Sequence, residues 1–174
     1  EITEVEKHNF DVIIFSMRRD LEAFTQEKAK PCISKTKYLT YFGLLISIFY
    51  WLLKKPFVFL NLLFLVTSKK YPTFNASLKN LWCILVAGQF ARIAKKERLT
   101  HLHAHFATYP AFIAMCISRL TKIPFSFTAH AHDIFLDKPF LKELVSDARS
   151  VIAISEYNKN YIIEYCKNGA ANKI

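Results

Sequence analysis

The sequence contains very little glycine, with only three glycines among 174 residues. A loop that wraps around phosphate groups needs several glycines close together, and neither the G-x-G-x-x-G pattern nor the P-loop pattern occurs. The chain therefore lacks a phosphate-binding loop of either kind. Its length and its 52% content of hydrophobic residues are sufficient for one folded domain, and they exclude an intrinsically disordered chain.

Acidic residues are absent from one long segment. Residues 28–96 contain twelve lysines and arginines but no aspartate or glutamate, whereas the rest of the chain has twelve basic and fourteen acidic residues. The whole net charge of +10 is therefore concentrated in residues 28–96, which also hold the most apolar stretch. Basic residues combined with apolar ones favour an anionic membrane surface as the partner, and no nucleic acid is predicted to bind.

No uninterrupted apolar run reaches the roughly 20 residues that a membrane-spanning helix needs. Residues 38–53 and 57–68 carry no charge, and Lys54, Lys55 and Pro56 separate them. We predict a helical hairpin inserted at residues 38–68, with Pro56 in the first turn of its second helix. Two interpretations stay open: both helices pack in the core, or the hairpin docks on a membrane. In the second case the docking residues are Trp51, Lys54, Lys55, Lys69 and Lys70.

The cysteines do not follow a pattern of paired or metal-binding residues. Cys32, Cys83, Cys116 and Cys166 contain no pair at C-x-x-C spacing. A domain of this size also needs no disulfides to be stable. The cysteines are therefore predicted to be reduced thiols of a cytoplasmic protein.

Short apolar runs alternate with helical segments along the chain. Strands are predicted at residues 10–16, 101–105, 125–129 and 150–155, and residues 17–30 form a polar connector. Helices are predicted at residues 1–8, 38–53, 57–68, 74–97, 110–120, 137–148 and 156–166. This order is typical of βαβ units, in which right-handed crossovers place helices on both faces of a parallel sheet. We predict one α/β domain over residues 1–174, with residues 38–68 as an apolar helical insert.

Histidines gather at the expected ends of these strands. The segment HLHAHF places His101, His103 and His105 on one face of an extended strand, and Leu102, Ala104 and Phe106 on the other. The segment HAHD, from His130 to Asp133, follows the next strand, and Ser155 and Glu156 follow the third. Ligands of open parallel sheets bind beyond the carboxyl ends of the strands. This edge is therefore the candidate site.

Three interpretations of the histidine cluster stay open. The first is a polar cleft in which imidazoles bind a substrate or exchange protons, because their pKa is near neutral. The second is a metal site built from His103, His105, His130 and Asp133. The third is local structure: Asp133 caps a turn, and Ser155 caps the helix in which Glu156 complements the dipole.

The segments HLHAHFATYPAFIAMCISRLTKIPFSFTAHAHDIF and SVIAISEYNKNYI resemble family 4 glycosyltransferases, above all those of bacterial exopolysaccharide and colanic-acid biosynthesis. The opening EITEVEKHNFDVIIFSMRR is similar to their first helix and second strand. The resemblance covers residues 1–20 and 97–167. It implies a Rossmann-like parallel sheet, the N-terminal, acceptor-side half of a GT-B fold. The family's first strand with its glycine loop, and its donor-binding C-terminal domain, are expected to lie outside these residues.

The resemblance also implies an activity. It is the retaining transfer of a sugar, of hexosyltransferase type, from a nucleotide-diphosphate sugar, with no metal or other cofactor. His130 and Asp133 would be catalytic, and the substrate-binding residues would be His103, His105, His132, Ser155 and Glu156. The expected acceptor is a lipid-linked saccharide on the inner face of the plasma membrane, and residues 1–174 alone are expected to be inactive. The alternatives are a metal-dependent hydrolase and a non-catalytic membrane-binding module.

Overall fold

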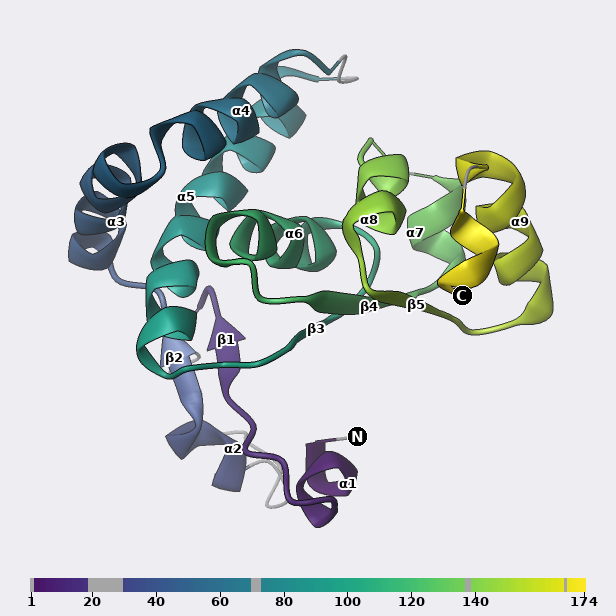
Figure 1. The fold of residues 1–174 in the computed structure, drawn as a ribbon, viewed down its shortest axis with the longest axis horizontal. Coiled ribbons are helices and arrows are strands. Elements are labelled where there is room, and N and C mark those ends of the chain that lie inside the picture. Colours follow the sequence, from purple (N-terminus) through teal and green to yellow (C-terminus); the bar gives the residue numbers. More distant parts are fainter. Residues whose placement is uncertain (1, 19–29, 70–72, 137–138, 168) are drawn as a thin grey trace.

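A computed structural model of the protein describes residues 2–18, 30–69, 73–136, 139–167 and 169–174 (Figure 1). The first elements are α1 (Ile2–Lys7), β1 (Ile14–Ser16), α2 (Lys30–Ser34), β2 (Thr36–Tyr38), α3 (Tyr41–Lys54), α4 (Pro56–Thr67) and α5 (Phe74–Lys96). They are followed by β3 (Leu102–His105), α6 (Tyr109–Thr121), β4 (Phe125–Ala129), α7 (Ala131–Phe135), α8 (Leu141–Asp147), β5 (Ser150–Ala153), α9 (Glu156–Cys166) and the 3-10 helix η2 (Ala170–Asn172).

The strands pair in parallel within two sheets. β3, β4 and β5 form a three-stranded sheet in that order, in which Leu102 lies opposite Phe125 and Phe127 lies opposite Val151. β1 and β2 form a separate two-stranded sheet. The predicted α/β class is confirmed, because helices connect and flank these parallel strands.

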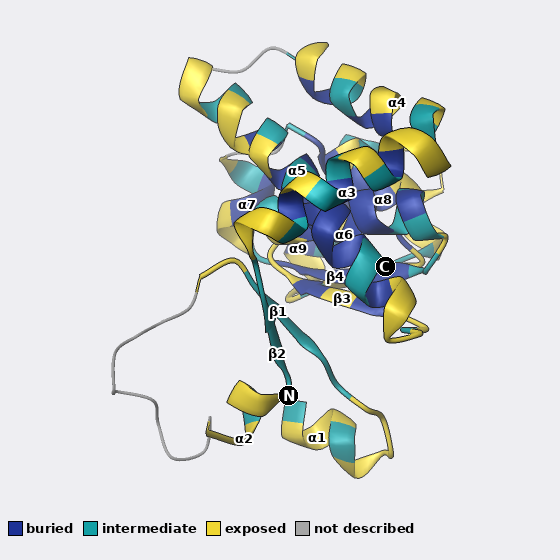
Figure 2. Ribbon diagram, turned by 90° about the vertical axis from the view of Figure 1, so that its left-hand side faces the viewer, coloured by how far each residue is buried: buried dark blue, intermediate teal, exposed yellow. Residues whose placement is uncertain are grey.

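α6, α5 and the α3–α4 hairpin lie in successive layers on one face of the three-stranded sheet, which differs from the predicted coverage of both faces by helices. α6 contacts β3 and β4 directly, α5 packs on α6, and the hairpin of α3 and α4 packs on α5 (Figure 1). The buried residues concentrate in α5, α6 and the adjoining sheet face, whereas the outward sides of α3 and α4 are exposed (Figure 2). The hairpin therefore forms the outermost layer of the molecule.

Local sequence signals explain how the hairpin begins and turns. The Thr40 hydroxyl accepts a hydrogen bond from the Gly43 N–H at 3.1 Å, which caps the start of α3. Lys55 separates the two helices, and Pro56 occupies the first turn of α4 as predicted. A bend of 115° separates the axes of α3 and α4, and the pair as a whole is long and apolar enough for a broken span. Among the described residues, no single helix meets the length and hydropathy required to cross a membrane.

The prediction that Trp51 docks on a membrane is wrong. Its side chain is only 1% exposed, because it faces α5 and donates a hydrogen bond from Nε1 to the Gly88 carbonyl at 2.8 Å. A Cβ added at Gly88 would lie 3.4 Å from the Trp51 ring, so the two helices pack in ordinary van der Waals contact at this point. Of the predicted docking lysines, Lys54 is exposed and Lys69 pairs with Glu143. Lys70 lies outside the described residues.

Several predicted elements differ from the structure at the N-terminal end. The strand predicted at residues 10–16 is reduced to β1, and it is half-buried rather than buried on both faces. Its partner β2 was not predicted, and neither was α2, because their sequences carry no apolar run. Most of the polar connector at residues 17–30 lies outside the described residues. At the other end, η2 forms where a loop was predicted.

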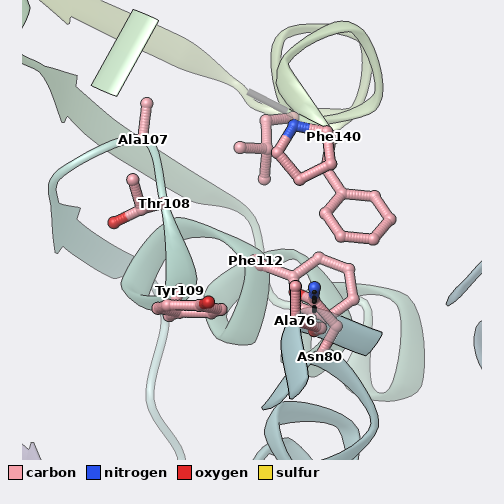
Figure 3. Close-up of a pocket in the computed structure, with 9 residues that line it drawn as sticks. Ala76, Asn80, Ala107, Thr108, Tyr109, Phe112 and Phe140 are labelled. Atoms are coloured by element: carbon pink, nitrogen blue, oxygen red, sulfur yellow. Dashed lines mark hydrogen bonds between the residues drawn. The ribbon is translucent and has the colours of Figure 1, made fainter. Parts of the chain in front are cut away.

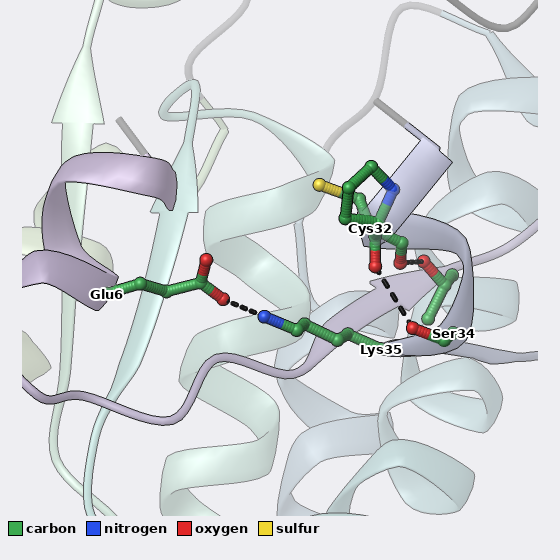
Figure 4. A network of polar contacts seen from close by, with 6 residues as sticks. Glu6, Cys32, Ser34 and Lys35 are labelled. Carbon is green, nitrogen blue, oxygen red and sulfur yellow. Dashed lines mark hydrogen bonds and ion pairs between the residues drawn. The ribbon is translucent and has the colours of Figure 1, made fainter. Parts of the chain in front are cut away.

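Polar contacts join the peripheral elements α1 and α2. The Lys35 ammonium group pairs with the Glu6 carboxylate (Figure 4). The Thr36 hydroxyl donates to the Cys32 carbonyl at 2.7 Å, and the Ser34 hydroxyl donates to the Pro31 carbonyl at 3.0 Å. These bonds close α2 directly before β2. Phe15 of β1 stacks on Phe90 of α5 with 4.7 Å between ring centroids, which attaches the small sheet to the main core.

All four cysteines lie in described segments and are free thiols. Burial raises the pKa of the Cys83 thiol to about 12 and also raises the pKa of Cys116. Both are consequently poor nucleophiles at neutral pH.

We predict that Trp51→Ala lowers the free energy of unfolding by about 3–5 kcal/mol, because it leaves a cavity between α3 and α5. Chemical denaturation followed by circular dichroism measures this change. Leu53→Ala is the matched control: it lies on the same helix but is 83% exposed, so its effect should stay within about 0.5 kcal/mol. Equal effects of the two variants would contradict the packing described here.

Candidate functional site

Three connections meet at the carboxyl edge of the three-stranded sheet. The first joins β3 to α6, the second leads from β4 into α7, and the third joins β5 to α9. Because the strands are parallel, all three connections leave the same edge. The candidate residues at this edge are His105, His130, His132, Asp133, Ser155 and Glu156.

Asp133 links the connection after β3 to the connection after β4 through hydrogen bonds. Its carboxylate is 3% exposed, and its Oδ2 atom accepts hydrogen bonds from the backbone N–H of Ala107 at 3.0 Å and of His130 at 3.1 Å. The first of these bonds spans 26 residues of sequence. Asp133 therefore positions the backbone on both sides of the candidate site, and its Oδ2 atom is occupied in doing so.

His130 lies at the start of α7, directly after β4. Its ring packs against the ring of Phe106, with 4.8 Å between the centroids and 33° between the planes. Phe106 has a positive φ of 76°, so it leaves the alternation of β3 instead of continuing the face of Leu102 and Ala104 as predicted. Among the described residues, the buried Nε2 atom of His130 has no hydrogen-bond partner. Because this nitrogen is buried, a ligand can bind it only after a side chain that covers it moves aside.

His101, His103 and His105 lie on the sheet face opposite the helices. The Ser126 hydroxyl is 2.8 Å from His101 Nε2 and 2.8 Å from His103 Nδ1, and the Thr128 hydroxyl is 3.2 Å from His103 Nε2. The rings of His103 and His105 pack edge to face at 5.3 Å. Burial, reinforced by the nearby Arg149, lowers the pKa of His101, which favours its neutral form. These hydroxyls organise His101 and His103 along the strand, behind the carboxyl edge.

The third connection is held by Ser155. Its hydroxyl accepts a hydrogen bond from the Asn158 N–H at 3.2 Å and caps α9, while Glu156 is exposed in the first helical turn. Asn158 is buried, and its side-chain Nδ2 has no partner within the described part of the chain. Phe135 of α7 packs edge to face on Tyr161 of α9 at 4.5 Å, which connects this third element to the second.

The structure thus brings the loops of His130, Asp133 and Ala107 into direct contact and places His132 on the exposed surface of α7. Within the described segments, no group of three or more histidine, cysteine, aspartate or glutamate side chains is placed to hold a metal ion. The predicted combination of His103, His105, His130 and Asp133 does not form such a group. Phe106, Ser126, Thr128 and Asn158 were not singled out from the sequence, since no spacing rule points to them.

A small cavity lies below the first connection, between the loop of Ala107 and Thr108, α5 and the start of α8 (Figure 3). Its volume is about 20 Å³, which is enough for one water molecule but not for a larger ligand. Phe112 and Phe140 stack at 4.2 Å along its wall. This cavity is therefore not the candidate site.

The comparisons with known proteins agree with this arrangement. The profile described as Glycosyltransferase Family 4 matches residues 2–172, which is almost the whole chain. The chain belongs to glycosyltransferase family 4. The expected family is therefore confirmed, and the domain is a glycosyltransferase domain with the α/β fold of a GT-B half. No curated protein matches the chain.

We predict that Asp133→Ala destabilises this glycosyltransferase domain by about 2–4 kcal/mol, because two backbone N–H groups lose a charged acceptor. Hydrogen exchange should accelerate at the Ala107 and His130 amides, which mass spectrometry of peptides can follow. Glu156→Ala also removes a carboxylate, but an exposed one, and should leave the exchange at both amides unchanged. Slow exchange at these amides in the Asp133 variant would refute the positioning role.

Proposed function

We propose that this domain transfers a hexosyl group from a nucleotide-diphosphate sugar to a lipid-linked saccharide, with retention of configuration. The acceptor class and the bacterial exopolysaccharide or colanic-acid pathway are extensions of the sequence resemblance. The observation that carries the proposal is the buried Nε2 of His130, which has no partner among the described residues and lies at the carboxyl edge of a family 4 domain. A buried polar atom without a partner is destabilising unless a ligand binds it.

In this proposal His130 forms a hydrogen bond with the transferred sugar and takes part in no covalent bond. During transfer, the bond from the anomeric carbon to the diphosphate oxygen breaks, and a bond to the acceptor hydroxyl oxygen forms on the same face of the sugar. The proton of the acceptor hydroxyl passes to the departing diphosphate oxygen. The imidazole of His130 would hydrogen-bond the sugar while positive charge develops at its anomeric carbon. Phe106 excludes water from one side of this imidazole, which strengthens such a bond. Asp133 acts as a positioning residue through the two backbone amides that it holds.

The remaining polar groups have supporting roles in this proposal. His105, at the end of β3, and the exposed His132 would contact substrate hydroxyls on either side of His130, and His103 would orient His105 through its ring contact. Ser155 and Glu156, at the start of α9, would line the far side. We place the enzyme in the cytoplasm on the inner face of the plasma membrane, where a lipid-linked acceptor would be presented.

We predict that His130→Ala in the full chain lowers kcat at least tenfold, a loss of about 1.4 kcal/mol of transition-state stabilisation. Initial rates with radiolabelled nucleotide sugar and acceptor lipid measure the effect, and circular dichroism checks the fold. His8→Ala is the matched control, since His8 is exposed and lies outside the proposed site. Turnover of the His130 variant at the wild-type rate would reduce this histidine to a packing role.

We predict that a chelator does not abolish turnover, because the proposed transfer relies on imidazole and backbone groups rather than on a metal. The measurement compares initial rates before and after dialysis against EDTA. The contrasting result is loss of activity that stoichiometric zinc restores, which would favour the metal-dependent hydrolase instead.

A further inference from the structure

The outward side of the α3–α4 hairpin is strongly apolar. We define the outer hairpin face as Phe42, Leu45, Phe49, Leu53, Phe57 and Phe64, whose side chains are between 59% and 86% exposed. These residues belong to both helices, whose outward sides are exposed (Figure 2). Single exposed apolar side chains are ordinary on protein surfaces, but a contiguous group of this kind marks an interaction site.

The orientation of α3 is the reverse of that expected for a helix facing water. Ser47 is 1% exposed and donates a hydrogen bond to the Gly43 carbonyl at 2.6 Å, whereas Phe49 and Leu45 point outward. The bond from Trp51 to Gly88 fixes this rotation of the helix about its axis. A helix in water directs its polar residues outward. The outer hairpin face therefore suits an apolar environment.

Positive charge borders the outer hairpin face. Lys54 is exposed at the end of α3, and partial burial, reinforced by the nearby charges of Lys122 and Lys95, lowers the pKa of Lys55. In the part of the chain that the structure describes, no carboxylate is paired with these lysines, and together they attract anions.

A basic groove of about 550 Å³ also lies between α3 and α5. Arg92, Lys95 and Lys96 line it, and the Arg92 guanidinium is held over the Tyr50 ring at 5.4 Å and donates to the Ser47 hydroxyl at 3.4 Å. The nearest acidic residue along the chain, Glu97, is already paired with Lys37 at 3.2 Å. The groove thus presents cations without an internal counter-ion among the described residues.

We propose that the outer hairpin face inserts into the interface of an anionic lipid bilayer, while the groove of Arg92 and the lysines around Lys55 bind lipid phosphates. Because of the 115° bend between α3 and α4, the hairpin is not one straight helix, and we place both helices along the bilayer surface. Phenylalanine and leucine side chains then lie at the boundary of the acyl chains, and the cations lie at the level of the headgroups.

A membrane fits these observations better than a protein or a nucleic acid. Protein interfaces are usually depleted in lysine, whereas this face is framed by lysines. Nucleic-acid sites interleave basic residues with polar donors, whereas the outer hairpin face has only phenylalanine and leucine at its centre. This proposal does not depend on the transferase activity, because binding to vesicles needs neither donor nor acceptor.

The test is co-sedimentation of the full chain with vesicles that contain no saccharide lipid. Wild type should bind vesicles of phosphatidylglycerol and phosphatidylcholine, more weakly in high salt, because screening acts on the phosphate contacts. The triple variant Phe49→Ser, Phe57→Ser and Phe64→Ser should need at least about tenfold more lipid for half-binding. Phe10→Ser is the matched control at an exposed phenylalanine on another part of the molecule, and it should bind as wild type.

A charge variant tests the second half of the proposal. Arg92→Gln combined with Lys95→Gln should reduce the preference for anionic over neutral vesicles. Lys167→Gln is the control, because Lys167 is an exposed lysine at the C-terminal end of α9, and it should leave this preference unchanged. The proposal is overturned if wild type does not bind, or if the phenylalanine variant binds as wild type. Loss of self-association in the phenylalanine variant, without any vesicle binding by wild type, would instead identify the face as a contact between protein copies.

Discussion

The burial of α5 is the constraint on which the rest of the fold depends. Its middle, from Cys83 to Ala91, is enclosed by α6 on one side and by the α3–α4 hairpin on the other, and only Leu85 in that stretch is partly exposed. Small residues such as Ala87, Gly88 and Ala91 allow the neighbouring helices to approach. The buried Gln89 donates to the Tyr38 carbonyl and accepts from the Thr40 N–H, both at 3.3 Å. α5 thus connects the small sheet of β1 and β2 with the hairpin, and it is connected to the three-stranded sheet through α6.

Patterns that are local in sequence were predictable. The apolar strands at β4 and β5, the paired apolar helices and the proline at the start of α4 follow from composition and turn chemistry alone. Elements that depend on distant partners were not. β2 is a polar tripeptide that becomes a strand only because β1 lies beside it, and the burial of Trp51 depends on its packing and hydrogen bond with α5, 37 residues away in the sequence. The spacing of aromatic residues cannot reveal which side of a helix meets the core when nearly every position is apolar.

The candidate site shows the same division. Parallel strands place His105, His130 and Ser155 at one edge, and that convergence was expected from the order of the elements. The predicted caps are confirmed, since Asp133 accepts from the nearby His130 amide and Ser155 accepts from the Asn158 amide. The bond from the Ala107 amide to Asp133 was not predicted, because it joins residues 26 apart. α7 was also not predicted, because a helix of 5 residues is too short to produce a periodic pattern of apolar residues. Family membership supplies the reaction class, and the geometry assigns positioning to Asp133 and leaves one imidazole nitrogen for a ligand.

Phe106 shows how a strained backbone can be retained for the sake of its side chain. A φ of 76° is unfavourable for a bulky residue and costs about 1–3 kcal/mol, whereas glycine would adopt it freely. Glycine, however, would remove the ring that covers the His130 imidazole. Replacement of Phe106 by glycine would therefore relieve the backbone strain, but it would also expose the His130 imidazole to water. Stability and shielding of the site change in opposite directions at this single residue.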